Sequence, residues 1–152
     1  ARQRCRGRAL LKAAALLMFC FPGSPTIYYG DEAGMEGFED PFNRQTYPWG
    51  HEDTDLLEWY RALGWLRGQH PALRRGSIRY VCGKGPLLAF LRESREERLL
   101  CVFNAGDTEQ LFPLDEGRPR LVLGQAGFLR SEDDDSYLLL LPPRSGSVFF
   151  ME

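Results

Sequence analysis

The sequence has few of the residues that build metal centres or bind nucleic acid. Its 152 residues include only two histidines, and its four cysteines form no C-x-x-C pair, so no metal and no other cofactor is expected. With 19 basic against 21 acidic residues the net charge is −2, which excludes the basic surface typical of nucleic-acid-binding proteins. The longest apolar run, residues 13–21, falls far short of the ~20 residues that span a bilayer. Neither a nucleic acid nor a membrane is therefore expected as a partner.

Patterns of nucleophilic and phosphate-binding sites are missing as well. Ser24 does not lie in a G-x-S-x-G elbow, and no G-x-x-x-x-G-K-[ST] loop occurs. Cys20 and Cys101 sit in apolar runs, which disfavours a reactive thiolate and is typical of buried thiols in a reducing compartment. The expected location is thus cytoplasmic, with an extracellular one left open. A Cys82–Cys101 disulfide also stays open, since both cysteines fall in expected strands.

The first half of the chain has an α/β pattern. Apolar residues at helical spacing predict a helix over 4–21, which Pro22 ends, and residues 25–30 form a short β-branched and aromatic run typical of a buried parallel strand. A long Gly- and Pro-rich loop follows over 31–52. Thr54 is the expected N-cap of a second helix that reaches Gln69. Its stripe of Trp59, Leu63 and Leu66 is expected in the core.

From residue 76 the hydrophobic period changes from that of helices to that of strands. Short β-rich runs alternate with turn signals at a spacing typical of an antiparallel sandwich. The chain is thus expected to have an α+β organisation, with one unit over 1–75 and an independently folding all-β unit over 76–152. The seven expected strands cover residues 77–82, 86–92, 98–104, 108–114, 119–123, 137–141 and 147–151.

Carboxylates on the long loop are the only abundant candidates for acid–base chemistry. Asp31, Glu32, Glu36, Glu39 and Asp40 follow the expected buried strand, and α/β barrels build their active sites after such strands. Acidic residues on a Gly-rich loop are also commonly just solvated. Position alone leaves both interpretations open.

The residues around this loop carry a specific resemblance. The stretch FPGSPTIYYGDEAGM over 21–35, then DPFNR over 40–44 and YPW over 47–49, closely resembles the α-amylase family, glycoside hydrolase family 13, at its eighth barrel strand and the following loop. It is most similar to the branch of neopullulanases, cyclomaltodextrinases, maltogenic amylases and oligo-1,6-glucosidases. His70-Pro-Ala-Leu73 resembles the exit from the last barrel helix, and residues 77–152 are similar in length and pattern to the C-terminal β-sandwich.

The resemblance implies a fold and a role. Residues 1–75 would be the terminal helix–strand–helix piece of a (β/α)8 barrel, and 76–152 the C-terminal β-sandwich. The three catalytic carboxylates of the family would precede Ala1, so the chain is expected to be a piece of a longer enzyme, inactive by itself, with no catalytic residue of its own. The parent would hydrolyse α-1,4 or α-1,6 bonds of maltooligosaccharides or related α-glucans with retention.

The same resemblance implies that Asp40 and Arg44 bind substrate. In the family the corresponding Asp and Arg hydrogen-bond a sugar at the non-reducing side of the cleavage point. A carboxylate accepts from vicinal hydroxyls and a guanidinium donates in a fixed fork, which suits that role. The alternative is an ion pair within the loop, since residues four apart often pair. Trp49 either stacks on a sugar or anchors the loop.

A different class of function remains as the alternative. The sandwich would then be a non-enzymatic module that binds a glycan or a partner protein. An exposed aromatic platform on the sandwich would favour this alternative. In either case the barrel piece is expected to expose Leu10, Leu17, Met18 and Phe21. The chain would then form a homo-oligomer through residues 1–50, or rearrange those residues away from barrel geometry.

Overall fold

The structure is a computed structural model that describes residues 2–37, 39–41, 43–115, 117–131 and 136–152, with side chains from Gly7 onward. Helices come first along the chain: α1 (Arg2–Cys20), α2 (Thr54–Gln69) and the short α3 (Pro71–Arg75). Strands follow. They are β1 (Ser77–Lys84), β2 (Leu87–Glu93), β3 (Arg98–Asn104), β4 (Gln110–Leu114), β5 (Pro119–Leu123), β6 (Gly127–Arg130), β7 (Tyr137–Leu141) and β8 (Ser145–Met151).

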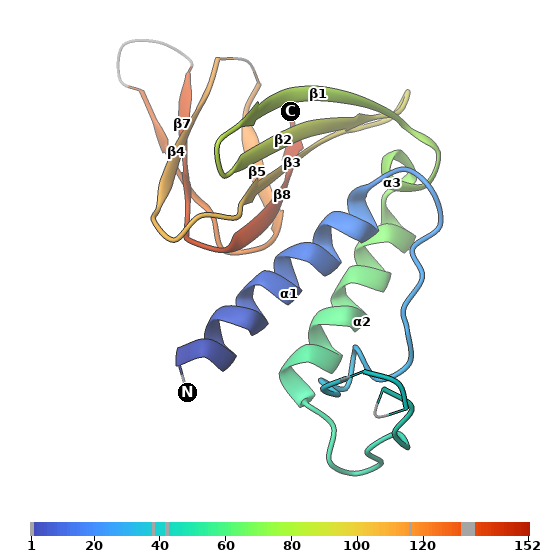
Figure 1. Ribbon diagram of the computed structural model, residues 1–152. Coiled ribbons are helices and arrows are strands. Elements are labelled where there is room, and N and C mark those ends of the chain that lie inside the picture. The colour runs from blue at the N-terminus through green and yellow to red at the C-terminus, as the bar shows by residue number, and fades with distance from the viewer. Residues whose placement is uncertain (1, 38, 42, 116, 132–135) are drawn as a thin grey trace.

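The strands form an antiparallel sandwich, as expected from the sequence (Figure 1). One sheet has the order β1-β2-β3-β8-β5 and the other the order β4-β7-β6. Between the sheets lies an apolar core that includes Leu100 and Val102 of β3, Phe149 of β8, and Leu139 and Leu141 of β7. The sandwich is open between β5 and β6, the edge strands on the same side of the two sheets.

The middle strands of the five-stranded sheet are buried on both faces because the helices cover their outer side, whereas the edge strand β1 is mostly exposed. Along β3, Leu100 and Val102 face the other sheet, whereas Leu99, Cys101 and Phe103 belong to a second core cluster with the helices. The alternation follows from the two-residue period of a strand. This second cluster continues without a break across residue 75. The division into units 1–75 and 76–152 stays a prediction.

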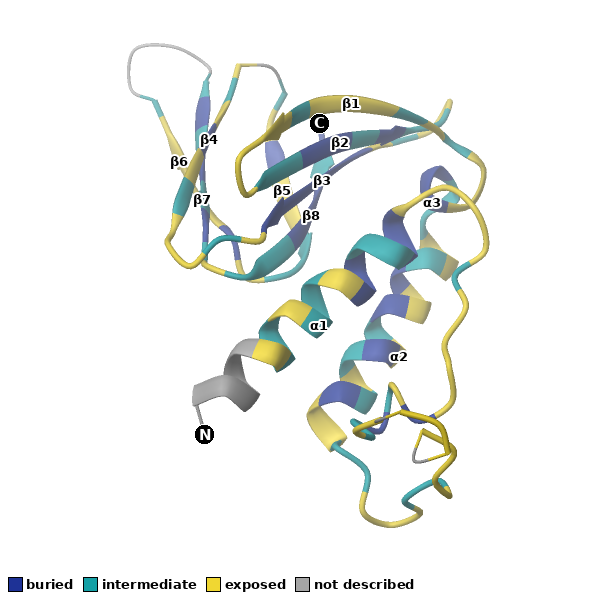
Figure 2. Ribbon diagram, viewed as in Figure 1, coloured by how far each residue is buried: buried dark blue, intermediate teal, exposed yellow. Residues whose placement is uncertain are grey.

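α1 lies against both α2 and the sandwich. Its contacts are with α2, β8 and β3, and its buried residues gather toward its C-terminal end, as Figure 2 shows. Leu16 has no exposed surface, and neither have Leu63 and Leu73 of α2 and α3. The expected stripe on α2 is confirmed for Leu63 and Leu66.

Three local expectations are wrong. Residues 26–29 form no strand, because no neighbouring strand of the described chain is there to pair with them. α2 is capped by Asp53 rather than Thr54: the Asp53 Oδ1 accepts the Leu56 N–H at 3.1 Å. An eighth strand, β6, pairs with β7. It was missed because its four residues are all exposed and show no alternation.

The exposed apolar surface differs in part from expectation, and the structure decides the cysteine pairing that the sequence left open. Leu10 and Phe21 are exposed, but Leu17 and Met18 are half-buried against the helix–sheet core. Cys82 and Cys101 are both free, and β2 separates their strands, so the disulfide does not form.

Candidate functional site

The segment between α1 and α2, residues 21–53, carries the residues predicted to bind substrate. A tight turn opens it, in which the Met35 and Ala33 N–H groups donate to the Gly30 carbonyl at 2.9 and 3.0 Å. Gly30 has a φ of +93°, and a Cβ there would overlap the Met35 side chain. The segment returns to α2 where the Asp53 N–H donates to the Ala33 carbonyl. Backbone bonds thus fix both ends of the loop.

Asp40 and Arg44 lie together on this loop and face solvent. Arg44 Nε is 2.8 Å from Asp40 Oδ1, and the two side chains are 72% and 60% exposed. The ion pair that the sequence left as an alternative is therefore present. It joins one guanidinium nitrogen to one carboxylate oxygen. Binding of a sugar by this pair stays a prediction.

Among the other loop carboxylates, Glu32 bonds within the loop. Glu32 accepts the Gly30 N–H at 3.0 Å and also the Tyr47 hydroxyl. Burial, together with the charge of Glu32, raises the pKa of Tyr47. Partial burial, with Glu32 as its neighbour, likewise raises the pKa of Asp31.

Trp49 is the most exposed aromatic residue of the loop. Its side chain is 80% exposed, and its ring packs against Tyr47 at a centroid distance of 4.5 Å. Tyr29 closes the same region by donating its hydroxyl to the Gln45 carbonyl at 2.9 Å. Trp49 is therefore not packed in a core of the described chain, and both interpretations, stacking on a sugar or anchoring the loop on the barrel, stay predictions. The nearby Phe38 and Phe42 lie outside the described residues.

Two arginines hold the end of α1, and no local pattern in the sequence indicates either role. Arg67 of α2 donates to the Phe19 carbonyl at 2.5 Å and the Phe21 carbonyl at 3.4 Å, and also to the Gly23 carbonyl. A guanidinium at a helix C-terminus satisfies its free carbonyls and complements the helix dipole. Arg67 thereby sets where the functional loop leaves the helix.

Arg92 of β2 joins α1 to the sandwich. It is 1% exposed, and its Nη1 donates to the Cys20 carbonyl at 2.5 Å and its Nη2 to the Gly76 carbonyl at 2.9 Å. Its Nε donates to the Ser77 carbonyl at 3.2 Å. Burial lowers the pKa of Arg92, but a guanidinium stays charged at neutral pH. No local pattern could have revealed this, since Cys20 lies 72 residues away.

No group of three or more His, Cys, Asp or Glu residues in the described parts of the chain is placed to hold a metal ion. No described helix is long and apolar enough to cross a membrane.

Comparisons with known proteins match nearly the whole chain. The family model for the Maltogenic Amylase C-terminal domain matches residues 84–148. An amylopullulanase of Thermoanaerobacter thermohydrosulfuricus is 38% identical over 112 residues, which are 66% of this chain and 8% of that protein. A cyclomaltodextrinase of Thermoanaerobacter pseudethanolicus is 31% identical over 144 residues, 92% of this chain and 24% of that protein.

Solved structures of similar proteins also match nearly the whole chain. The native debranching enzyme of Nostoc punctiforme superposes with a TM-score of 0.85 at 32% identity, covering 95% of this chain and 31% of that one. An Anoxybacillus α-amylase gives a TM-score of 0.84 at 30% identity, covering 95% and 32%. The chain thus spans about a quarter or less of the length of the curated relatives named above, and about a third of these structures. The helix–loop–helix arrangement, the sandwich and these matches together place the chain in the α-amylase family, glycoside hydrolase family 13, as a C-terminal part of it.

Proposed function

We propose that this chain is part of an α-glucan-acting glycoside hydrolase that cleaves α-1,4 or α-1,6 bonds of maltooligosaccharides or related glucans with retention. The observation that carries the proposal is the match over 92% of the chain to a protein named cyclomaltodextrinase, together with the amylopullulanase match. Retaining hydrolysis needs two carboxyl groups about 5–5.5 Å apart on either side of the bond. Those groups would come from another part of the enzyme.

Within that enzyme, the loop over 21–53 would position the sugar. Asp40 and Arg44 would each use the hydrogen-bonding capacity that their ion pair leaves free: the carboxylate accepts from one hydroxyl while the guanidinium donates to its neighbour. Holding a sugar in register with distant reacting groups lowers the entropic part of the barrier. The sandwich would hold α1 and α2, and so the loop, through Arg92 and the shared core.

The experiment is a pair of neutral substitutions in the full product of the gene that encodes this chain. Asp40→Asn and Arg44→Gln should each lower kcat/KM on maltotriose about tenfold or more, because charged hydrogen bonds to substrate are worth roughly 1.5–3 kcal/mol. Glu39→Gln, an exposed neighbour, is the control. Equal kcat/KM in all three variants would contradict the proposal. The 152-residue chain by itself should release no reducing sugar from maltotriose or pullulan.

We also propose that the chain by itself associates with a second copy through residues 1–50. Leu10, Phe21 and Ile27 are each about 40% exposed, and Tyr28 and Tyr29 more so. Apolar side chains exposed in this way are usually covered when they form a contiguous surface. Light scattering should show a mass above 17.4 kDa, and a monomer with residues 1–50 resistant to protease would contradict the idea.

We propose a cytoplasmic location for the enzyme. Cys20 and Cys101 are free, fully buried and in contact with each other, and burial raises the pKa of Cys101. Buried free thiols are typical of a reducing compartment. Fractionation of the source cells, with antibody against this chain, tests it: recovery in the culture medium would contradict it.

A further inference from the structure

The outer face of the three-stranded sheet β4-β7-β6 is apolar and lies away from the helices. The helices pack on the outer side of the five-stranded sheet instead (Figure 1). Leu139 and Leu141 of β7 belong to the core between the two sheets. Leu138 and Leu140 are only half-buried and belong to neither core cluster. Because successive side chains of a strand point to opposite faces, Leu138 and Leu140 lie on the outer face.

The neighbouring strands add uncharged residues to the same face. Each outward residue of β7 has one such neighbour on β4 and one on β6, which gives two rows across the sheet. Leu111 of β4 is 52% exposed and Leu129 of β6 is 56% exposed. The six residues are here termed the leucine face: one row is Leu111, Leu140 and Gly127, and the other is Pro113, Leu138 and Leu129.

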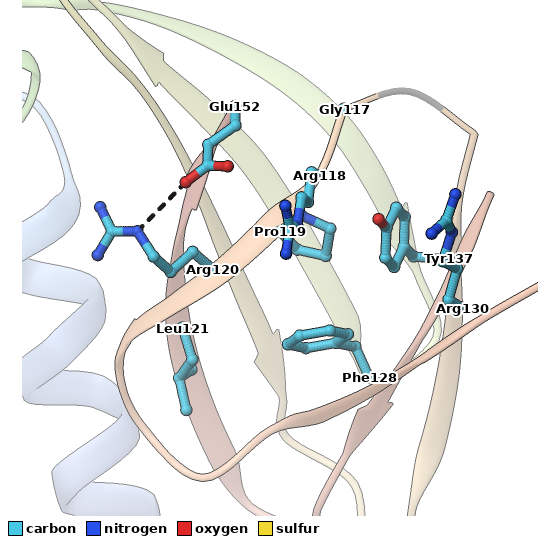
Figure 3. A pocket seen from close by; sticks show the side chains of 9 residues that line it. All are labelled: Gly117, Arg118, Pro119, Arg120, Leu121, Phe128, Arg130, Tyr137 and Glu152. Atoms are coloured by element: carbon cyan, nitrogen blue, oxygen red, sulfur yellow. Dashed lines mark ion pairs between the residues drawn. The ribbon is translucent and has the colours of Figure 1, made fainter. Parts of the chain in front are cut away.

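The opposite side of the same strands faces the interior of the sandwich. Figure 3 shows Phe128 and Tyr137 pointing into the groove of about 760 Å³ between β5 and β6. Phe128 also packs against Phe149 of the other sheet at a centroid distance of 6.4 Å. Gly127 and Leu129 flank Phe128 along the chain, so they face away from the groove. Packing within the sandwich therefore does not account for the leucines of the outer face.

Large and small residues alternate at the corners of the leucine face. Leu111 and Leu129 occupy two diagonally opposite corners, and Pro113 and Gly127 occupy the other two. Consider two such faces related by a two-fold axis that runs across the strands, in the plane of contact. Leu111 of one copy would then lie over Pro113 of the second copy, and Leu129 over Gly127. The face is thus complementary to itself, which is what a two-fold symmetric interface requires.

The size and the charge of the face also fit a second copy. Three strands of four to five residues cover about 14 Å by 17 Å at the usual strand spacing and rise. An area of this extent suits the apolar centre of a dimer interface, and the polar rim around it supplies the rest. None of the six residues is charged, so the face carries no repulsion between its own copies and offers no counter-charge to an ionic partner.

We infer that the leucine face is a dimer interface, at which two copies of the chain pack the outer faces of their three-stranded sheets together. Sheets that pack face to face lie about 10 Å apart with interdigitated side chains. This surface is separate from residues 1–50, which lie on the helical side of the molecule (Figure 1). The helices would form the outer ends of such a dimer, so the loop with Asp40 and Arg44 would stay accessible in both copies.

The test is sedimentation equilibrium of the 152-residue chain carrying Leu10→Lys, a substitution that weakens association through residues 1–50. This chain should form a dimer of twice 17.4 kDa. Adding Leu129→Lys should raise the dimer Kd about a hundredfold or more, because a two-fold interface carries each substitution twice. Leu121→Lys is the matched control, since Leu121 is a 38% exposed leucine on β5, outside the face. It should leave the Kd unchanged.

Dilution of the Leu10→Lys chain gives a second measurement, which holds even if Leu129→Lys does not fold. The NMR methyl signals of Leu111 and Leu129 should shift as the dimer dissociates, and those of Leu121 should not. Three outcomes would overturn the inference. They are a monomeric Leu10→Lys chain at every concentration, an equal Kd with Leu129→Lys and with Leu121→Lys, and face methyl signals that do not change on dilution. A monomeric chain would assign the leucine face to a different occupant, such as another part of the enzyme.

Discussion

Every strand of the sandwich has a hydrogen-bonded neighbour, whereas the described part of segment 21–53 contains neither helix nor strand. The sandwich orders itself by repeated backbone pairing and two apolar layers. The loop is ordered by isolated hydrogen bonds, such as those between Tyr29 and Gln45 and between Ala33 and Asp53. Regular pairing tolerates the loss of one contact, but a loop fixed by a few bonds does not. The candidate substrate residues lie in the second kind of structure.

The two regions are nevertheless joined by one core. Leu16 and Phe19 of α1 and Leu73 of α3 share a cluster with Phe90 and Val148 of the sandwich. Arg92 adds three hydrogen bonds at the same boundary. We therefore expect the helices and the sandwich to unfold together, although they differ in how they are built.

The largest loss of stability should come from cutting the chain at this boundary between the helices and the sandwich. A chain that starts at Arg75 exposes five buried side chains of the sandwich, each worth about 1.5–3 kcal/mol, and their sum matches the whole stability of a typical domain. We expect it to lose its cooperative thermal melt by circular dichroism. A sharp β-type melt near that of the full chain would show that the sandwich folds by itself. The five residues are Phe90, Leu99, Cys101, Phe103 and Val148.

The next effect should come from Arg92→Met, which keeps the length of the side chain but removes its donors. The buried carbonyls of Cys20, Gly76 and Ser77 lose their partner, so the free energy of unfolding should fall by about 3–5 kcal/mol. Urea denaturation measures it. Arg95→Met, at an exposed turn between β2 and β3, is the control and should cost less than about 0.5 kcal/mol. Similar losses in both variants would contradict the role given to Arg92.

A smaller loss of stability is expected from a substitution at the junction of α2 and α3. Glu97 lies 2.7 Å from His70 Nδ1 and accepts the Ala72 N–H at 2.9 Å, so it caps α3 from the β2–β3 turn. Glu97→Gln should lower the free energy of unfolding by about 1–2 kcal/mol. Glu96→Gln, the exposed neighbour, provides the comparison in the same urea experiment. If Glu96→Gln costs as much, the cap has no special role.

The smallest effect concerns pH. The hydrogen bond from Lys12 at 2.6 Å holds the pKa of Asp55 below its usual value. A lowered folded pKa means that the stabilisation is complete at neutral pH and is lost as the pH falls through that value, below about 4. Since Asp55 is 60% exposed, the gain should stay under about 1 kcal/mol. Lys12→Met should remove this part of the acid dependence, and an unchanged dependence would contradict it.

Much of the fold could be predicted from local pattern. The helix expected over 4–21 is observed as Arg2–Cys20, and all seven expected strands match within two residues at either end. The strand over 26–29 was wrong because a strand depends on a neighbour that sequence does not show. Asp40 and Arg44 were found through a motif that left both sugar binding and an ion pair open, and the structure shows the ion pair.

The sequence by itself determined the periods of the helices and strands, the order of the two regions and the family motif on the loop, because each depends on residues close together in the chain. Only the tertiary structure decided which carbonyls Arg67 and Arg92 reach, which face of β3 meets the helices and where β5 and β6 leave a groove. These features depend on contacts between residues tens of positions apart. Such contacts form only once the whole chain has packed, so no local pattern records them.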